Sequence, residues 1–235
     1  HKGSYMDLNQ NVNENVDTGT LRIHLTNESN GTPVQGAKIS ISYTGNPSQT
    51  IEEVSADDSG NSEELTLNAP PLEYSMEPSE EQPYAEYTIR VQAPGYRDIT
   101  VSAINVLPGE TAIQNVRMEA EDAPGDRIDM VVIAAHTLYA EYPPKIPEDE
   151  IKPMNESGEI VLSRVVIPEY IVVHDGAPGD TTASDYYIRY RDYIKNVASS
   201  EIYATWPDAA IRANVLAIMS FTLNRVYTEW YRGKG

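Results

Sequence analysis

The stretch Thr20-Leu21-Arg22-Ile23-His24-Leu25-Thr26 places an apolar side chain at every second position. A period of two predicts a β-strand with one buried face, because successive side chains of a strand point to opposite sides. The same spacing recurs as far as Met118, in runs separated by clusters of Gly, Pro, Asn and Asp. The further runs are Ile39, Ile41 and Tyr43; Leu65 and Leu67; Tyr87, Ile89 and Val91; Ile99, Val101 and Ala103; and Ile113 and Val116. Their spacing predicts an antiparallel sandwich of about seven strands.

The composition is that of a folded protein, since 40% of the 235 residues are apolar and 23% are charged. The apolar residues are dispersed, and no run reaches the roughly 18 that a membrane-spanning helix needs. No signal-peptide pattern is visible at the start, where residues His1 to Tyr5 read as a cloning remnant; whether an export signal once preceded them is left open. The absence of cysteine excludes disulfides and a cysteine nucleophile.

The charge is unevenly distributed along the chain. Residues 1–160 contain 9 Lys or Arg against 28 Asp or Glu, whereas residues 161–235 contain 8 of each. The whole excess behind the formal net charge of -19 therefore lies in the first part. An acidic surface repels phosphate backbones and anionic lipid, so we expect no nucleic-acid partner and no membrane insertion.

Two folded parts are expected. Residues 1–18 are polar and predict a tail, and residues 19–119 hold the sandwich. Residues 120–160 are acidic and rich in Pro, which predicts an exposed linker or pro-segment, although the apolar run from Met130 to Ala135 could dock as a strand or short helix. Residues 161–235 predict an α+β segment, with two short strands split at Pro168, a loop over 175–182 and two helices.

Three turn sequences in the first part resemble one family. Gly31-Thr32-Pro33-Val34-Gln35-Gly36-Ala37, Asp58-Ser59-Gly60 and Val91-Gln92-Ala93-Pro94-Gly95-Tyr96 are similar, in this order, to landmarks of the carboxypeptidase regulatory-like domain. The resemblance covers about residues 19 to 119 and implies a transthyretin-like sandwich. It also implies an accessory role in stability, interaction or regulation, without chemistry of its own.

The second part turns helical at Asp192, with Ile194, Val197 and Ala198 on one side of a short helix that ends near Ser200. Glu201 follows directly. Thr205-Trp206-Pro207-Asp208 is typical of a helix start, with Thr205 as the N-cap and Pro207 in the first turn. The helix that it opens is predicted to bury one face and to run to Tyr231, because apolar residues recur every three or four positions: Ile211, Val215, Ile218, Met219, Leu223, Val226 and Trp230.

This helical segment also resembles a known family. The strings from Asp192 to Ile202 and from Trp206 to Ala217 match, in spacing and order, the stage II sporulation protein D family of lytic transglycosylases. The catalytic acid of that family maps onto Glu201, while Ile202 stands where the family has Met. Ile167 to His174 and Phe221 to Tyr231 extend the resemblance to the spore cortex-lytic enzymes of clostridia. A pro-region with a β module precedes the catalytic domain in those enzymes.

What the resemblance implies is the cleavage of peptidoglycan glycan strands by one carboxyl. Glu201 would protonate the leaving oxygen and then take a proton from the muramic 6-hydroxyl, which gives a 1,6-anhydro product without a second carboxylate. Glu201 must carry its proton near neutral pH for this role, which partial burial against Ile202 or Trp206 would favour. Tyr203 is the aromatic residue that we expect to contact a sugar ring.

No metal site is expected, because His1, His24, His136 and His174 are scattered, and no cofactor is expected. The expected partners are glycan strands of the spore or cell envelope and an activating protease. Two other interpretations stay open. The chain could be a non-catalytic wall-associated binding protein, because a Glu near a helix end is more often a solvated side chain. It could also be an inert fragment of an enzyme, because most of the substrate groove of that family has no counterpart here.

Overall fold

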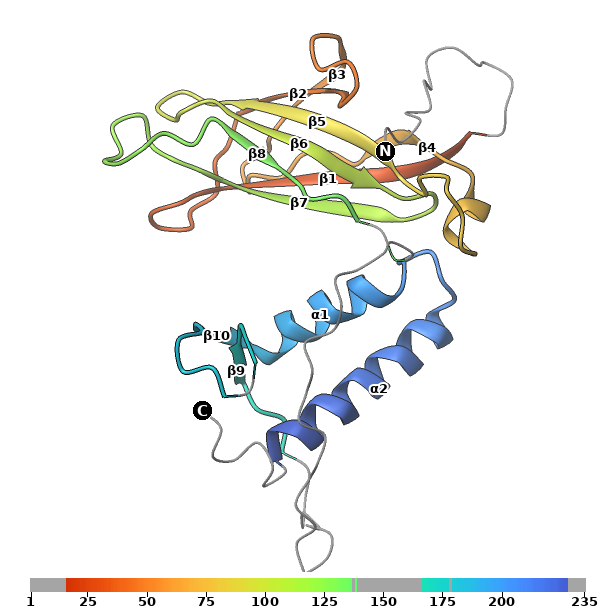
Figure 1. The fold of residues 1–235 in the computed structure, drawn as a ribbon. Coiled ribbons are helices and arrows are strands. Elements are labelled where there is room, and N and C mark those ends of the chain that lie inside the picture. The colour runs from red at the N-terminus through yellow and green to blue at the C-terminus, as the bar shows by residue number, and fades with distance from the viewer. Residues whose placement is uncertain (1–15, 137, 139–165, 178, 228–235) are drawn as a thin grey trace, which may run out of the picture. The chain divides into compact units, whose positions relative to one another are not determined.

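The computed structural model describes residues 16–136, 138, 166–177 and 179–227 (Figure 1). The chain divides into two compact units, His1–His136 and Thr137–Gly235. The predicted fold class is confirmed, because the first unit is a β-sandwich and the second combines short strands with two helices. Within the described ranges, no helix is both long and apolar enough to cross a membrane.

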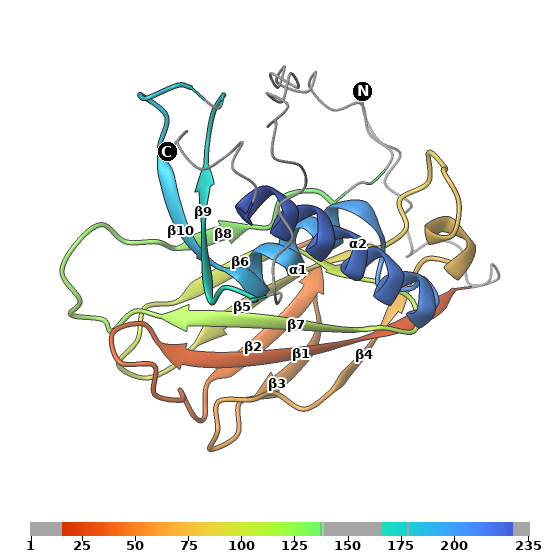
Figure 2. The ribbon, with the colours of Figure 1, turned by 90° about the horizontal axis from the view of Figure 1, so that it is seen from below.

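The first unit consists of two sheets. One sheet has the order β4-β1-β7, built from Leu65–Ala69, Asp17–Asn27 and Thr111–Met118. The other has the order β3-β2-β5-β6-β8, built from Thr50–Ser55, Lys38–Tyr43, Ala85–Gln92, Ile99–Val106 and Met130–Val132. The 3-10 turn η1 spans Leu72–Ser75. Figure 2 shows β1 between β7 and β4, in agreement with the parallel pairing of β1 with β7 and its antiparallel pairing with β4.

The core of the sandwich follows the period of two that the sequence predicted. Leu21, Ile23 and Leu25 of β1 are fully buried, whereas Arg22 between them is exposed. Residues from both sheets join them in one cluster, which includes Ile39, Ile41, Leu65, Tyr87, Ile89, Val91, Val101, Val116 and Met118. Burial of this much aliphatic surface, at about 25 cal/mol per Å², is the main force that holds the two sheets together.

Two details of the sandwich differ from the prediction. Strand β3 was not among the predicted runs because its apolar residues, Ile51 and Val54, stand three positions apart and only Val54 is buried. Ile113 was placed in a core-facing run with Val116, yet its side chain is 66% exposed. Positions 113 and 116 differ by an odd number, so they point to opposite faces of β7.

The predicted linker begins too early at residue 120. Ala120 forms a β-bridge with Tyr96, and β8 pairs with β6 through Thr100↔Met130 and Ser102↔Val132. The backbone N–H of His136 then donates to the Tyr84 hydroxyl at 3.0 Å. The segment up to His136 therefore belongs to the first unit. The remainder of the predicted linker, apart from Leu138, lies outside the described residues, as does the predicted tail up to residue 15.

The second unit joins a hairpin to a helix pair. Strands β9 (Tyr170–His174) and β10 (Asp185–Arg189) are antiparallel, and helices α1 (Tyr190–Glu201) and α2 (Asp208–Tyr227) follow. Their common core contains Ile171, Tyr190, Ile194 and Ile218. The predicted strand before Pro168 has no counterpart at Val166 and Ile167, while its earlier residues and the predicted helical turn at 228–231 lie outside the described ranges.

Helix α2 has the single buried face that its sequence predicted. Ile218 lies in the core, and Val215, Met219 and Leu223 of the predicted face pack against the same core. Val226, near the end of that face, is exposed, as are Leu216 and Phe221 on other sides of the helix. The helical spacing of the apolar residues therefore identified both the helix and the side that faces the core.

Candidate functional site

Glu201 is the last residue of α1, at the point where the chain leaves the helix for the connector to α2. The next residue, Ile202, is buried and extended, and its backbone N–H still donates to the carbonyl of Ala198 at 3.1 Å. This hydrogen bond continues the helical ladder for one more residue and fixes where Glu201 stands. The side chain of Glu201 itself is exposed.

The carboxyl of Glu201 contacts α2 through Asn214. Nδ2 of Asn214 donates a hydrogen bond to Oε2 of Glu201 at 2.7 Å. Asn214 Oδ1 is buried and has no hydrogen-bond partner among the described residues. The sequence interpretation missed Asn214. Its signal is present in hindsight, because Asn214 precedes the buried Ile218 by four positions and so shares a helix face with it.

The electrostatic surroundings of Glu201 are mixed. The end of a helix carries partial negative charge from its last carbonyl groups, which opposes a carboxylate, whereas the Asn214 N–H stabilises one. No basic side chain of the described part forms an ion pair with Glu201; Arg191 of α1 and Arg212 of α2 face Asp192 and Asp208 instead. The prediction that Glu201 is partly buried is wrong for this chain, because the α1–α2 connector turns Ile202 inward and leaves Glu201 outside.

Tyr203 does not lie where a sugar ring could stack on it. Its side chain is only 2% exposed, and its hydroxyl accepts a hydrogen bond from the backbone N–H of Leu138 at 3.3 Å. Its expected role as a substrate contact is therefore corrected to that of a packing residue, because aromatic stacking on a glycan needs an open ring face. Among the neighbouring aromatic residues, Tyr190 is buried, while Tyr186 and Tyr187 on β10 are exposed.

Two serines directly before Glu201 have structural partners. The hydroxyls of Ser199 and Ser200 both donate to the Asn196 carbonyl at 2.9 Å. This back-bonding occupies both hydroxyls within the helix, and no His lies beside them in sequence to activate either one. Glu201 is therefore the side chain of this helix end with acid and base chemistry.

His174 forms a second polar cluster, in the β9–β10 hairpin. Its Nδ1 lies 2.8 Å from Asp185 Oδ1 and its Nε2 lies 3.0 Å from the Ala177 carbonyl oxygen. The hydrogen bond to Asp185 is the main cause that raises the pKa of His174 above its ordinary value. Only the doubly protonated ring can donate to both acceptors, so this cluster closes the hairpin loop most tightly when His174 is charged.

No metal centre emerges from these groups. Within the described residues, no three or more His, Asp or Glu side chains gather in a way that could hold an ion. His24 is paired with Asn61 at 2.8 Å in the sandwich, and His174 faces one carboxylate and one carbonyl.

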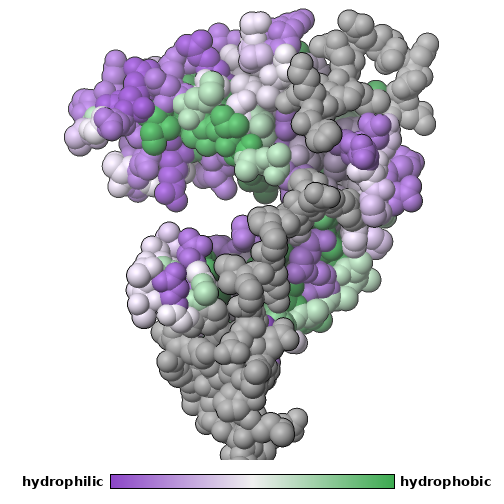
Figure 3. All heavy atoms as spheres, viewed as in Figure 1, coloured by the Kyte–Doolittle hydropathy of each residue, from purple (hydrophilic) through white to green (hydrophobic). Residues whose placement is uncertain are grey.

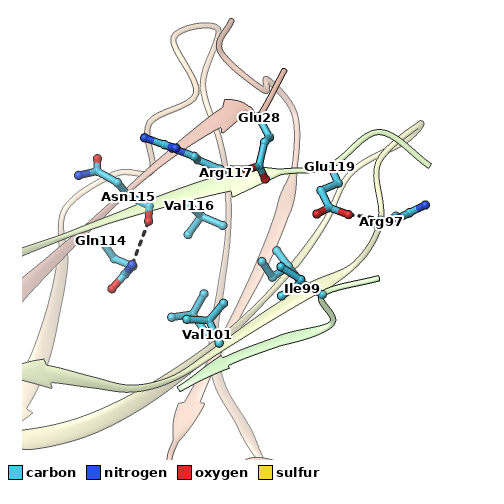
Figure 4. Close-up of a pocket in the computed structure, with 11 residues that line it drawn as sticks. Glu28, Arg97, Ile99, Val101, Gln114, Asn115, Val116, Arg117 and Glu119 are labelled. Carbon is cyan, nitrogen blue, oxygen red and sulfur yellow. Dashed lines mark hydrogen bonds and ion pairs between the residues drawn. The ribbon is translucent and has the colours of Figure 1, made fainter. Parts of the chain in front are cut away.

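The sandwich carries a groove between its edge strands β7 and β8. Exposed apolar side chains of β8 and of the loop before it form a hydrophobic patch on this side (Figure 3). Beneath it lies a space of about 170 Å³ into which Ile99, Val101 and Val116 point (Figure 4). Two of the charged side chains at its rim form an ion pair with each other, Arg97 and Glu119 at 2.8 Å. The groove therefore offers apolar contact surface beside a charged rim.

Comparison with known proteins bears on the fold alone. No family model matches the chain, and no curated protein matches it. Among solved structures, it is similar to the Bacillus anthracis TIE protein, at 24% identity over 44% of this chain and 17% of that one, with a TM-score of 0.31. A minor pilin of Streptococcus agalactiae is 13% identical over 48% of each chain, with a TM-score of 0.32.

A third similar structure is the 5-hydroxyisourate hydrolase of Klebsiella pneumoniae, 17% identical over 42% of this chain and 89% of that one, with a TM-score of 0.27. The chain spans less than two thirds of the length of the first two structures.

Proposed function

We propose that this chain is the pro-form of a lytic transglycosylase that cleaves peptidoglycan of the spore cortex, with Glu201 as the acid and then the base. The observation that carries the proposal is the position of Glu201 at the junction of two packed helices, where Asn214 of α2 binds its carboxyl. The motif resemblance across residues 192–217 supports the same residue. Exposure of Glu201 lets a polymeric substrate reach the carboxyl from solvent, but the partial burial expected to favour its protonated form is absent.

The reaction needs no second carboxylate. Glu201 gives its proton to the glycosidic oxygen, the bond from C1 of N-acetylmuramic acid to that oxygen breaks, and N-acetylglucosamine leaves with a free 4-hydroxyl. The carboxylate then takes the proton of the muramic 6-hydroxyl while O6 bonds to C1. This closes the 1,6-anhydro ring and returns Glu201 to its protonated state. No water is consumed, in contrast to the hydrolysis that two-carboxylate glycosidases perform.

The acidic first unit would act as the pro-region of this enzyme. The excess of Asp and Glu before residue 161 would be repelled by a negatively charged wall, so removal of this part by a protease would leave a neutral catalytic part. Binding of the intact and the cleaved protein to purified cortex tests this idea. We expect the cleaved form to bind more cortex and release more product at low salt; equal binding and release would contradict the pro-region role.

A non-catalytic wall-associated protein is the second function. The apolar groove between β7 and β8 favours it, because such a surface suits protein contacts, and so does the exposed position of Glu201. In that function, Glu201 would be a solvated side chain and its replacement would change nothing.

Mass spectrometry of soluble products from purified spore cortex distinguishes the two functions. The full-length protein, activated by protease, would be compared with Glu201→Gln and with Glu169→Gln, a control at another exposed Glu of the same unit. Anhydro-muropeptides from the wild type and from Glu169→Gln, but not from Glu201→Gln, would support the transglycosylase. Products with reducing ends would indicate a hydrolase, and no release at all would favour the binding protein.

A further inference from the structure

The side-chain amide of Asn214 contacts Glu201. Its nitrogen has a hydrogen-bond partner and its oxygen has none within the ranges that the structure describes. Nδ2 donates to Glu201 Oε2 at 2.7 Å, while Oδ1 is buried and has no hydrogen-bond partner in the described part of the chain. A buried acceptor without a donor is costly, by about 1–3 kcal/mol in proteins generally. A catalytic role is one of the recognised explanations for such an atom in a folded protein.

The packing of α1 on α2 fixes where this amide stands. Asn214 precedes Val215, which packs against the core of the second unit, and lies one helical turn before the buried Ile218. Ile194 of α1 belongs to the same core. The distance between Asn214 and Glu201 is therefore set by the helix pair and not by a flexible loop, which is what a positioning residue requires.

A side-chain amide has both a donor, its N–H, and an acceptor, its carbonyl oxygen, and these are the two kinds of partner that a carboxyl needs in its two protonation states. A carboxylate can only accept hydrogen bonds and therefore takes the N–H of Asn214, whereas a protonated carboxyl carries an O–H that needs an acceptor. Rotation of the amide by half a turn brings Oδ1 to Glu201 as that acceptor and moves Nδ2 to the position that Oδ1 leaves. One asparagine can thus hold the same carboxyl in both protonation states.

We propose that Asn214 is a positioning residue that holds Glu201 in both states, donating to the carboxylate through Nδ2 and accepting from the protonated carboxyl through Oδ1. The inference rests on the proposed function, in which Glu201 alternates between acid and base. Asn214 keeps the carboxyl aimed at the same place while its proton leaves and returns. A purely structural hydrogen bond between the two helices would use the donor end alone.

Nuclear magnetic resonance of the 235-residue chain tests the exchange without any assay of activity. We expect the side-chain amide signals of Asn214 to shift with pH at the same midpoint as the carboxyl carbon of Glu201. In Glu201→Gln this pH dependence should vanish, and the amide of Asn224, exposed on the same helix, should not follow the Glu201 midpoint. Amide signals of Asn214 that ignore pH, or that titrate equally in Glu201→Gln, would overturn the proposal.

Kinetics of the full-length, protease-activated enzyme supply the second test. Asn214→Leu removes both the donor and the acceptor of the amide. It should lower kcat by about a hundredfold with little change in KM, because the carboxyl of Glu201 loses its fixed orientation while substrate binding is unaffected. Asn214→Gln, which keeps an amide, should recover part of kcat.

The outcomes of the two tests separate the inference from the function on which it rests. If wild type releases no anhydro product while the Asn214 amide still titrates with Glu201, the proposed function fails and the coupling stands. If wild type is active but Asn214→Leu keeps its kcat, the positioning role is refuted and the proposed function stands. A loss in Asn214→Leu that Asn214→Gln does not relieve, with an equal loss of thermal stability, would also refute it.

Discussion

Asp185 lies directly opposite His174 in the β9–β10 hairpin, and its Oδ1 is 2.8 Å from Nδ1 of the His174 ring. The other ring nitrogen faces the carbonyl of Ala177 in the loop between the two strands. Asp180 of the same loop adds a second negative charge near the ring. The hairpin that leads into α1 is thus closed by a side chain whose charge changes near neutral pH.

The stability of this hairpin should depend on pH through His174. The pKa of His174 is raised above the ordinary 6.5, first by the hydrogen bond that its ring donates to Asp185, so the folded state binds the proton more tightly than the unfolded state. The contribution is therefore fully present below pH 6.5 and is lost as pH rises through the folded pKa. Denaturation of wild type and His174→Gln at several pH values should give a difference in unfolding free energy that shrinks in that direction. A difference that grows with pH would contradict this assignment.

Gly60 should tolerate no side chain. Its φ is +75°, and a Cβ placed there would lie 2.4 Å from the carbonyl oxygen of Leu25 and 3.2 Å from the backbone nitrogen of Val34. Gly60→Ala should therefore lower the unfolding free energy of the sandwich by more than about 2 kcal/mol, from steric overlap in addition to left-handed strain. Chemical denaturation followed by circular dichroism measures this.

Gly31→Ala is the matched control for Gly60→Ala. Gly31 has a similar φ of +71°, but nothing lies within 4 Å of a Cβ built there. Left-handed strain alone, about 1 kcal/mol, should remain. An equal loss of unfolding free energy in the two variants would mean that the backbone around Leu25 moves away from the new Cβ without a measurable cost.

Two apolar residues of α2 should differ in their contribution to stability. Ile218 is 7% exposed and packs against α1, whereas Leu216 is 63% exposed. Ile218→Ala should cost roughly 3 kcal/mol of unfolding free energy, and Leu216→Ala less than about 0.5 kcal/mol. Thermal denaturation followed at 222 nm reports mainly on the helices of the second unit. A large loss in Leu216→Ala would show that this side of α2 is covered in solution.

Two ion pairs of the sandwich should contribute unequally. The side chains of Arg97 and Glu119 are 14% and 23% exposed, whereas those of Lys38 and Glu53 are 54% and 50% exposed. Double-mutant cycles in which Glu119 and Glu53 are replaced by Gln measure the coupling free energy of each pair. It should exceed about 1 kcal/mol for Arg97–Glu119 and stay below about 0.5 kcal/mol for Lys38–Glu53. Salt at 1 M should weaken the Lys38–Glu53 coupling more in proportion, because solvent ions screen exposed pairs. Equal couplings would contradict the role of burial.

The regular parts of the fold could be predicted because their signal is local. Leu21, Ile23 and Leu25 repeat at a period of two, and Ile194 and Val197 at a helical spacing, so each segment carries its own pattern. Strand β10 has no such pattern, since Asp185, Tyr186 and Tyr187 are all exposed. It forms because β9 offers its free edge, and this pairing is a property of two segments together.

The candidate site divides in the same way. Glu201 could be named from the sequence because the motif around it is contiguous, from the helix before it to Trp206-Pro207 after it. Asn214 could not, because its link to Glu201 exists only once α2 packs on α1. For Tyr203 the motif predicted a function that the packing excludes. Its place near Glu201 suggested a substrate contact, but its side chain is buried.

The sequence by itself determined the sandwich, the two helices, the uneven charge and the identity of the carboxyl residue at the helix end, because each depends on neighbouring residues or on composition. Only the tertiary structure decided that β8 completes a sheet with β6, that Glu201 is exposed, and that Asn214 binds it. The physical reason is that burial and side-chain hydrogen bonds depend on which segments pack against each other. A pattern of period two or 3.6 shows that a face is apolar and does not state what covers it.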